Sequence, residues 1–269
     1  IYRTDMTCSL IITTYNWKEA LELVLISACN QSVPPLEIII ADDGSRKDTK
    51  DLIDEISKRT TITIIHSWQE DEGFRAAKSR NKAISKASGE YIVVVDGDII
   101  LHEDFIKDHM KFSRKNHFVQ GIRAKLNQEK SEEIMKSKQY TFAAFEKGIK
   151  NKRNSIKLPF LSKLFSGKRY FKKLDMLQTC NMAFFKQDCI LVNGFNEDFI
   201  GWGKEDSEFG YRLLNSGIGR RDLRFSAIGY HIHHEGNSRD MLEENIKIFQ
   251  NTLNNKLYEC KNGISKYLN

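Results

Sequence analysis

Two carboxylates stand one glycine apart where an apolar run of the sequence ends. The run is VVVDGDII, residues 93 to 100, in which Asp96, Gly97 and Asp98 follow three valines. Carboxylate oxygens are the ligands that hard divalent cations prefer, and such cations keep open positions for water and phosphate. Gly97 has no side chain, so the backbone and a ligand can approach each other closely there. The pair predicts a metal site; a solvated turn with two acids is the competing interpretation.

Three histidines near the end of the chain include a natural distant ligand for that metal. They occur in YHIHH as His231, His233 and His234. Imidazole binds transition metals well. On a strand, His231 and His233 would share one face, and His234 would face the other way. A surface cluster, or a histidine bonded to a core carbonyl, is the alternative for each histidine taken alone.

The stretch GWGKEDSEF, residues 201 to 209, combines an aromatic ring with two acids. Trp202 lies between two glycines and is therefore expected on an adaptable loop. Glu205 and Asp206 follow at the start of a predicted helix, where the helix dipole favours negative charge. The pattern indicates an aromatic platform for a sugar face beside a carboxylate that takes a hydroxyl proton. Helix capping and a buried tryptophan are the structural alternative.

Strands that alternate with helices precede these motifs. Because the predicted strands are continuous apolar runs, we expect an α/β fold with a mostly parallel sheet covered by helices. In such sheets ligands bind beyond the carboxyl ends of the strands. TTYN, ADDGS and DGD all lie at such ends, so they should converge on one crevice. The strands are predicted over residues 8–14, 36–45, 61–67 and 90–96.

The second half of the chain is less regular, and no linker divides it from the first. We expect one domain over 1–269, with a nucleotide-binding half over 1–100, a smaller acceptor-binding and catalytic half over 101–237, and a helical extension over 238–269. Within the second half, helices are predicted over 139–151 and 205–217, and strands over 179–185 and 224–234.

Composition limits the class of protein. Of the 269 residues, 40% are hydrophobic and 29% are charged, which is typical of a globular domain with a real core. No apolar run has the eighteen or more residues of a membrane span, and the N-terminal IYRTDMTCSL lacks the apolar stretch of a secretory signal. Five cysteines without a CxxC pair argue against a disulfide framework and a cysteine zinc site. A cytoplasmic protein is expected.

Taken together, the motifs resemble a known family. SLIITTYN, IIIADDGS, DEGFRAAKSRN, VVVDGD, GWGKEDSEF and YHIHH occur in the order seen in inverting GT-A fold glycosyltransferases of the family 2 type. The second half is especially similar to the branch of β-1,4-galactosyltransferases and chondroitin polymerases. The resemblance implies a UDP-sugar donor, Mn²⁺ or Mg²⁺, and transfer of a hexose or N-acetylhexosamine to a glycan or lipid-linked glycan. It also implies a role in bacterial surface polysaccharide or lipopolysaccharide synthesis.

The resemblance also implies roles for residues of the first half. By matching motif positions, Thr13, Tyr15 and Asp43 would hold uracil and ribose. Arg75 would lie near the nucleotide. Asp96 would contact ribose or a water on the metal.

The remaining roles concern the metal and the acceptor. Asp98 would ligate the metal, and His231 matches the family's metal-binding histidine, with His234 as the fallback. Asp206 matches the catalytic base. The residues expected to contact the acceptor are Glu205, through a hydroxyl, and Trp202, by stacking on a sugar.

A basic block lies in the middle of a chain whose net charge is +6. Residues 147–173 contain ten Lys or Arg and no Asp or Glu, with aromatic and aliphatic residues interleaved. This pattern is typical either of a solvated face or of a segment that binds an anionic membrane surface, which would place the enzyme at the inner face of the cell membrane. No nucleic-acid-binding motif accompanies the charge, so nucleic acid is not an expected partner.

Two other functions compete with glycosyl transfer. A sugar-nucleotide pyrophosphorylase is expected to carry a glycine-rich phosphate loop after its first strand, and TTYNWKEA has none. A non-catalytic sugar-binding module would need neither Asp98 nor His231. Metal-dependent release of UDP from a UDP-sugar would argue against the binding module.

Overall fold

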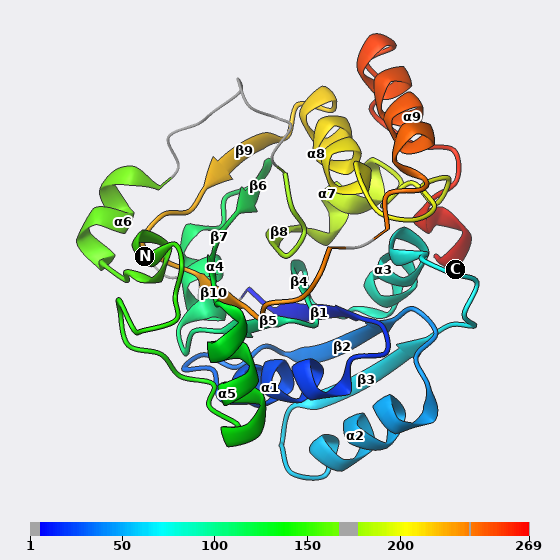
Figure 1. The fold of residues 1–269 in the computed structure, drawn as a ribbon. Coiled ribbons are helices and arrows are strands. Elements are labelled where there is room, and N and C mark those ends of the chain that lie inside the picture. The colour runs from blue at the N-terminus through cyan, green and yellow to red at the C-terminus, as the bar shows by residue number, and fades with distance from the viewer. Residues whose placement is uncertain (1–5, 167–176, 237, 269) are drawn as a thin grey trace.

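The computed structural model describes residues 6–166, 177–236 and 238–268. Its centre is a seven-stranded sheet in the order β3-β2-β1-β4-β8-β6-β9, with a three-stranded sheet, β5-β10-β7, beside it (Figure 1). The first half contains β1 (Cys8–Thr14), α1 (Lys18–Cys29), β2 (Glu37–Asp42), α2 (Lys47–Ser57), β3 (Thr63–Trp68), α3 (Ala76–Lys86) and β4 (Tyr91–Asp96).

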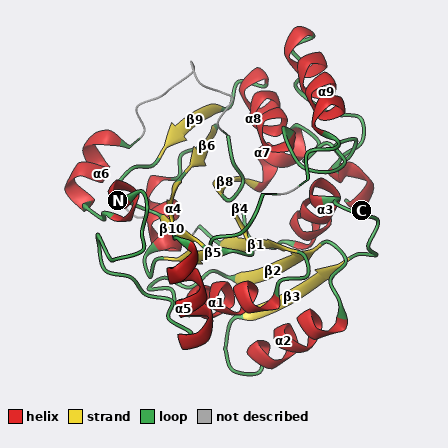
Figure 2. Cartoon of the chain, viewed as in Figure 1, coloured by secondary structure: helices red, strands yellow, loops and turns green. Residues whose placement is uncertain are grey.

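The predicted alternation of strands and helices in the first half is confirmed. β1 pairs in parallel with both β2 and β4, and Thr13 lies opposite Ala41 on one side and Asp96 on the other. Because the strands are in register, their carboxyl ends meet at one edge of the sheet. Helices cover both faces, as the continuous apolar strands require (Figure 2).

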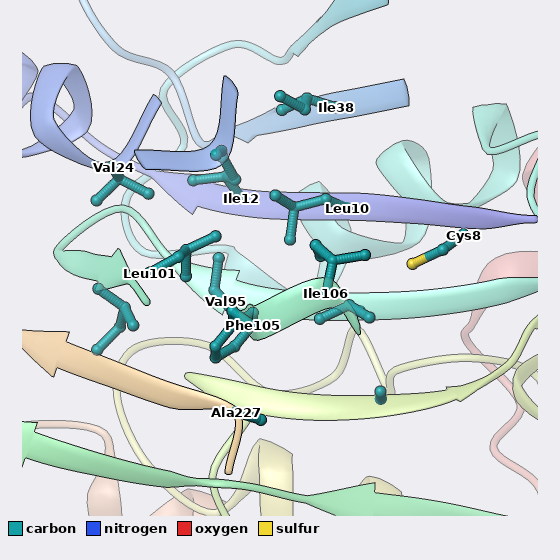
Figure 3. Packing of buried hydrophobic residues seen from close by; sticks show 14 of the residues in the cluster. Cys8, Leu10, Ile12, Val24, Ile38, Val95, Leu101, Phe105, Ile106 and Ala227 are labelled. Atoms are coloured by element: carbon teal, nitrogen blue, oxygen red, sulfur yellow. The ribbon is translucent and has the colours of Figure 1, made fainter. Parts of the chain in front are cut away.

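The two faces of the sheet build two cores. Leu10 and Ile12 of β1 point to one face, where they pack with Val24 of α1 (Figure 3). Ile11 points to the other face and packs with a cluster that includes Ile84 of α3. All five side chains are fully buried, and burying each aliphatic side chain of this kind stabilises the fold by about 1.5–3 kcal/mol.

The second half departs from parallel order. β8 is antiparallel to both β4 and β6, and β10 is antiparallel to β5 but parallel to β7. The elements are β5 (Ile99–Leu101), α4 (Phe105–Phe112), β6 (His117–Gln120), β7 (Ile122–Lys125), α5 (Gln128–Ser137), α6 (Pro159–Phe165), β8 (Asn181–Phe185), α7 (Lys186–Leu191), α8 (Glu205–Asn215), β9 (Gly219–Asp222), β10 (Ile228–His231) and α9 (Leu242–Asn254).

The helix predicted over 139–151 is wrong. The chain turns there instead: the Glu146 carboxylate accepts a hydrogen bond from the backbone N–H of Ala143 at 2.9 Å and forms an ion pair with Lys130 at 2.8 Å. Gly148 has φ = +93°, and a Cβ there would lie 2.5 Å from the Cβ of Lys130. Tertiary contacts therefore override the helical propensity of this stretch.

The strand predicted over 224–234 is much shorter than expected. Phe225 and Ala227 have φ of 59° and 47°, which are incompatible with a strand, and β10 spans only Ile228–His231. No helix within the described parts of the chain has the length and apolar character needed to cross a bilayer.

Candidate active site

A cleft of about 520 Å³ opens at the carboxyl ends of β1 and β4 and faces the N-terminus of α8. Because parallel strands carry ligands at these ends, it is the expected place for a nucleotide. The residues predicted from the sequence that line this cleft are Thr13, Tyr15, Asp43, Asp96, Asp98, Trp202, Glu205, Asp206, His231 and His234.

The acidic pair is held close to β1 by Gly97. Its backbone N–H donates a 2.7 Å hydrogen bond to the carbonyl oxygen of Thr13. A Cβ at this position would lie 2.9 Å from the same oxygen, so a larger residue would push the turn away from the strand. The glycine between the two acids is thus required by a close approach of two backbones.

Asp43 and Tyr15 contribute a buried carboxylate and an exposed ring to the cleft. Asp43 is only 4% exposed and accepts 2.7 Å hydrogen bonds from the Gln69 side chain and the backbone N–H of Arg75. Burial raises the pKa of Asp43 to about 6, which these donors oppose. Tyr15 is 49% exposed, and its hydroxyl donates to Asp71 at 2.9 Å. An exposed ring beside a buried acid suits a flat, hydrogen-bonding ligand such as a base.

The side chain of Arg75 does not line the cleft. Its Nε donates to the carbonyl oxygen of Glu72 at 3.3 Å, and it lines a separate, smaller pocket with Lys78 and Glu197. Its connection to the predicted nucleotide site is through its backbone N–H on Asp43.

Asp98 and two histidines form a candidate metal centre. Oδ2 of Asp98 lies 3.4 Å from Nε2 of His231 and 3.1 Å from Nε2 of His234. One ligand atom from each of the three residues lies within 4.8 Å of the others. Oδ1 of Asp98 is buried and has no hydrogen-bond partner in the described structure. Because buried polar atoms are normally paired, this oxygen fits the place of a metal ligand.

Sheet pairing explains how the distant histidines meet Asp98. In the pairing of β10 with β5, His231 lies opposite Ile99, the residue after Asp98. The strand alternation predicted for YHIHH stops at His231, so His234 returns to the same side as His231, and the prediction that it faces away is wrong. The backbone N–H of His233 donates to Ser131, and His233 is not part of the cluster.

The pKa values of His231 and His234 are shifted in opposite directions. Burial lowers the pKa of His231 to about 4, so its ring is neutral and able to bind a metal at neutral pH. The hydrogen bond to Asp98 raises the pKa of His234.

Glu205 and Asp206 begin α8 but have different surroundings. Asp206 accepts hydrogen bonds from Thr179: its Oδ2 lies 2.9 Å from the backbone N, and its Oδ1 lies 2.8 Å from the hydroxyl. Glu205 is 8% exposed, and burial, reinforced by the nearby Asp206 charge, raises its pKa to about 7. The preceding loop can turn into the helix because Gly201 and Gly203 have φ of +73° and +114°.

Three arginines that received no role from the sequence also line the cleft, although one of them, Arg80, lies within the motif DEGFRAAKSRN. Arg80 is buried among carboxylates. Arg123 places Nη1 3.4 Å from the Cys180 sulfur, and the guanidinium of Arg239 lies over the Trp202 ring, 5.8 Å from its centroid. A signal for Arg80 was present in the sequence, since it shares a helical stripe with Ala76 and Ile84, both buried.

Comparison with known proteins identifies the family of this chain. The model "Glycosyl transferase family 2" matches residues 9–186. The chain belongs to this family. A second model, "N-terminal domain of galactosyltransferase", matches residues 161–235. The resemblance to GT-A glycosyltransferases of the galactosyltransferase and chondroitin-polymerase branch is thereby confirmed.

Individual family 2 relatives are distant. Chondroitin synthase of Escherichia coli is 26% identical in an alignment of 245 residues that covers 83% of this chain and 34% of that protein, so the chain spans about a third of its length. The E. coli protein WfaP, a UDP-Glc:alpha-D-GlcNAc-diphosphoundecaprenol beta-1,3-glucosyltransferase, is 27% identical over 239 residues, covering 89% of this chain and 82% of that protein. TarS of S. aureus superposes with a TM-score of 0.64 at 17% identity, over 91% of this chain and 64% of that one, and shares the fold.

Proposed function

We propose that this family 2 glycosyltransferase moves a hexose or N-acetylhexosamine from a UDP-sugar to a glycan hydroxyl, with inversion at the anomeric carbon. One observation carries the proposal: the carboxylate of Asp206 and the cluster of Asp98, His231 and His234 line the same cleft. Inversion needs one base on the acceptor side and charge stabilisation on the leaving-group side. The cleft supplies both.

The acid–imidazole cluster is the proposed metal site. Asp98, His231 and His234 would hold a divalent cation. Bound there, the cation would neutralise the charge that develops on the departing diphosphate. Two imidazoles and one carboxylate suit Mn²⁺ better than Mg²⁺, which prefers oxygen ligands in octahedral geometry. We therefore expect Mn²⁺ to support more activity than Mg²⁺ at equal concentration.

Asp206 is the proposed general base. The two donors of Thr179 fix its carboxylate, which would accept the proton of the acceptor hydroxyl as that oxygen attacks. Trp202, 39% exposed on the same wall, offers a face for the acceptor sugar, and Glu205 beside it would bind an acceptor hydroxyl.

The first half of the cleft is the proposed nucleotide site. Asp43 and Tyr15 would bind uracil and ribose, together with Thr13, while Asp96 would contact ribose or a metal-bound water. TarS has been solved with UDP and with UDP-GlcNAc, and the name of WfaP specifies UDP-Glc, which supports a UDP-sugar as donor. The names of the relatives also support a role in bacterial surface polysaccharide synthesis.

A donor screen followed by product analysis tests the proposal. Thermal shifts with a panel of UDP-sugars and Mn²⁺ should identify one preferred donor, and acceptor screening with that donor should give a glycoside of inverted configuration by NMR. A product of retained configuration would contradict the assignment of Asp206. Formation of UTP from the UDP-sugar and pyrophosphate would instead support the pyrophosphorylase alternative.

The helix α6 is a proposed contact with an anionic lipid surface. Around it, Leu158, Phe160, Leu164 and Phe165 are exposed, Phe160 to 79%. Six Lys or Arg and no acid occupy residues 147–166, and apolar side chains with basic neighbours are typical of interfacial segments. The rest of the basic block, 167–173, lies outside the described residues.

Vesicle sedimentation tests this contact. The protein should bind vesicles that contain anionic lipid and not neutral ones, and Phe160→Ser should weaken binding at least several-fold. The control is Tyr258→Ser, which removes a ring of 54% exposure far along the chain. Equal binding of both variants, or no binding to anionic vesicles, would contradict the proposal.

A further inference from the structure

The turn before α9 packs against the loop that carries Trp202. Two glycines of that loop allow the close approach. A Cβ at Gly201 would lie 2.8 Å from Cβ of Met241, and a Cβ at Gly203 would lie 2.9 Å from Cδ1 of Leu242. The turn therefore helps to build the wall of the cleft that contains Trp202.

Helix α9 fixes both the turn and the Trp202 loop. The side chain of Asn245, only 1% exposed, donates hydrogen bonds to the carbonyl oxygens of Ile200 at 3.0 Å and Trp202 at 3.4 Å. Arg239 begins the turn, and its carbonyl oxygen accepts from the backbone N–H of Leu242 at 3.0 Å. The backbones of Arg239 and Trp202 are thus held by the same helix.

The side chain of Arg239 lies over the Trp202 ring and has no acidic partner. Its guanidinium carbon is 5.8 Å from the ring centroid, and both residues line the cleft. In the described parts of the chain, no carboxylate lies within ion-pair distance of this guanidinium; that of the adjacent Asp240 accepts from the Ser238 hydroxyl at 2.6 Å. Stacking on a ring face orients a guanidinium and leaves its N–H groups able to donate.

The other two arginines of the cleft have different surroundings. Arg80 forms ion pairs with three carboxylates, including both acids of α8, so these acids already have a cation. Arg123 lies on the side of the proposed metal site, where its charge acts on His231 and His234. Arg239 is therefore left to interact with a ligand that lies against Trp202.

The chemistry of this ligand follows from the guanidinium. Its fork of N–H donors matches the paired oxygens of a carboxylate or a phosphate, and an unpaired cation in a binding cleft favours an anion. Both family models end before Arg239, at residues 186 and 235. The position of this arginine is thus a feature of the chain that the family match does not account for.

We propose that Arg239 is a specificity-determining residue that selects an acceptor with an anionic group, a carboxylate or a phosphate, beside the sugar that packs on Trp202. The role of this site as an acceptor site rests on the proposed function. The preference of the Trp202 wall for anionic sugars does not, because it follows from the placement of the unpaired guanidinium.

Binding of small glycosides tests this preference without turnover. The probes are methyl β-glycosides of glucose and galactose in three forms: neutral, oxidised to the C6 carboxylate, and phosphorylated at O6. UDP and the diamagnetic Mg²⁺ keep the donor end occupied, and the indole N–H signal of Trp202, assigned with Trp202→Phe, reports binding by NMR.

The wild-type protein should bind at least one anionic form about 5-fold or more tightly than its neutral counterpart, and high salt should reduce the difference. A preference for the carboxylate would indicate a uronic acid in the acceptor, and a preference for the phosphate would indicate a phosphorylated sugar.

Variants of Arg239 separate charge from structure. Arg239→Gln should reduce the preference for the anionic form by about 5-fold and leave the affinities for the neutral form and for UDP unchanged. Arg239→Lys should keep part of the preference, because it retains the charge and loses the fork. The control is Arg59→Gln, an equal change of charge outside the cleft, which should bind every probe as the wild type does.

Four results would overturn the inference. They are equal binding of the neutral and anionic forms by the wild type, an unchanged preference in folded Arg239→Gln, an equal loss of neutral and anionic binding in that variant, and weaker UDP binding in place of a lost preference, which would assign Arg239 to the donor. The expected preference in a protein without transferase activity would instead reject the proposed function.

Discussion

Residues 8–98 and 99–234 build one cleft by different means. In the first region, parallel strands in register end at one edge, and the site residues follow directly from those ends. In the second region, Glu205 and Asp206 begin a helix, His231 ends a strand that runs antiparallel to β5, and His234 follows it. Residues 8–98 form one wall of the cleft, the first wall, and its geometry is therefore set by local strand order. Residues 99–234 form the second wall, and its geometry is set by packing between segments far apart in the sequence.

The difference suggests a division of labour between the two walls. The strand ends of the first region offer buried acceptors and an exposed ring, which suit recognition of a constant nucleotide. The second region carries the proposed base and the proposed acceptor platform. Two features cross between the regions: the metal cluster, with Asp98 from one and both histidines from the other, and the ion pairs of Arg80.

The largest expected effect lies in the second region. Asp206→Asn keeps the size of the side chain, but it replaces one acceptor oxygen with an amide nitrogen and removes the ability to accept a proton. Because general bases contribute about 10²–10⁴ to turnover, kcat should fall by that factor, while the Kd for the donor, measured calorimetrically, should change little.

Asp188→Asn is the control for that substitution. Asp188 is an acid of α7 that does not line the cleft, so its replacement should leave kcat near that of the wild type. If Asp206→Asn retained turnover, the chemical step could no longer be assigned to the second wall.

The metal cluster should show the next largest effect. Asp98→Ala, His231→Ala and His234→Ala should each lower Mn²⁺ affinity by at least about 10-fold, since each removes one of three neighbouring ligand atoms. Mn²⁺ titration of the melting temperature measures this without substrate. His233→Ala is the control and should leave the titration unchanged. If His234→Ala behaved like His233→Ala, the site would have a single histidine.

The two regions also differ in how much the sequence predicts. The strands ending at Thr14, Asp42 and Asp96 were predictable because continuous apolar runs of β-branched residues have few alternatives, and their ends fix Asp43 and Asp98. The residue types of the second region were found through motifs, but their arrangement was not. That His234 joins His231 depends on where β10 ends, which long-range pairing decides.

Arg80 shows why part of the first wall was also missed. An arginine in a lysine-rich helix is usually solvated, and it is the acids of α8, some 125 residues later, together with Asp96 that make its burial favourable. The false helix over 139–151 has a similar cause, because Lys130 and Glu146 form a contact that periodicity does not encode.

A substitution in the first region should affect binding more than turnover. Asp43→Asn removes the charge of an acid at the proposed nucleotide end and should raise donor KM by about 10-fold or more, as expected for a lost charged hydrogen bond. The kcat at saturating donor should stay within a few-fold of the wild type. Asp51→Asn on the exposed face of α2 is the control. A fall in kcat without a change in KM would mean that both walls take part in the chemical step.

The smallest expected effect is on stability, because the ionised carboxylate of Glu205 destabilises the folded protein. Burial raises the pKa of Glu205 to about 7, above its ordinary value of 4.5. Below pH 4.5 the folded and unfolded states both hold the proton, so Glu205 carries no penalty. As pH rises to 7 the unfolded state loses its proton first, so the folded state is progressively destabilised. Glu205→Gln should therefore stabilise the protein by roughly 1–3 kcal/mol at pH 8, since one pKa unit corresponds to about 1.4 kcal/mol, and by almost nothing at pH 4.5.

Melting temperatures of the metal-free protein between pH 4.5 and 8 measure this difference. Glu205→Gln should gain a few degrees over the wild type at pH 8, and the gain should shrink toward zero as pH falls. The exposed Glu90→Gln should give a flat difference across the range. Parallel curves for Glu205→Gln and the wild type would show that Glu205 ionises as readily in the folded protein as in the unfolded chain. The second wall would then store no electrostatic strain, and the contrast with the strand ends of the first would rest on geometry alone.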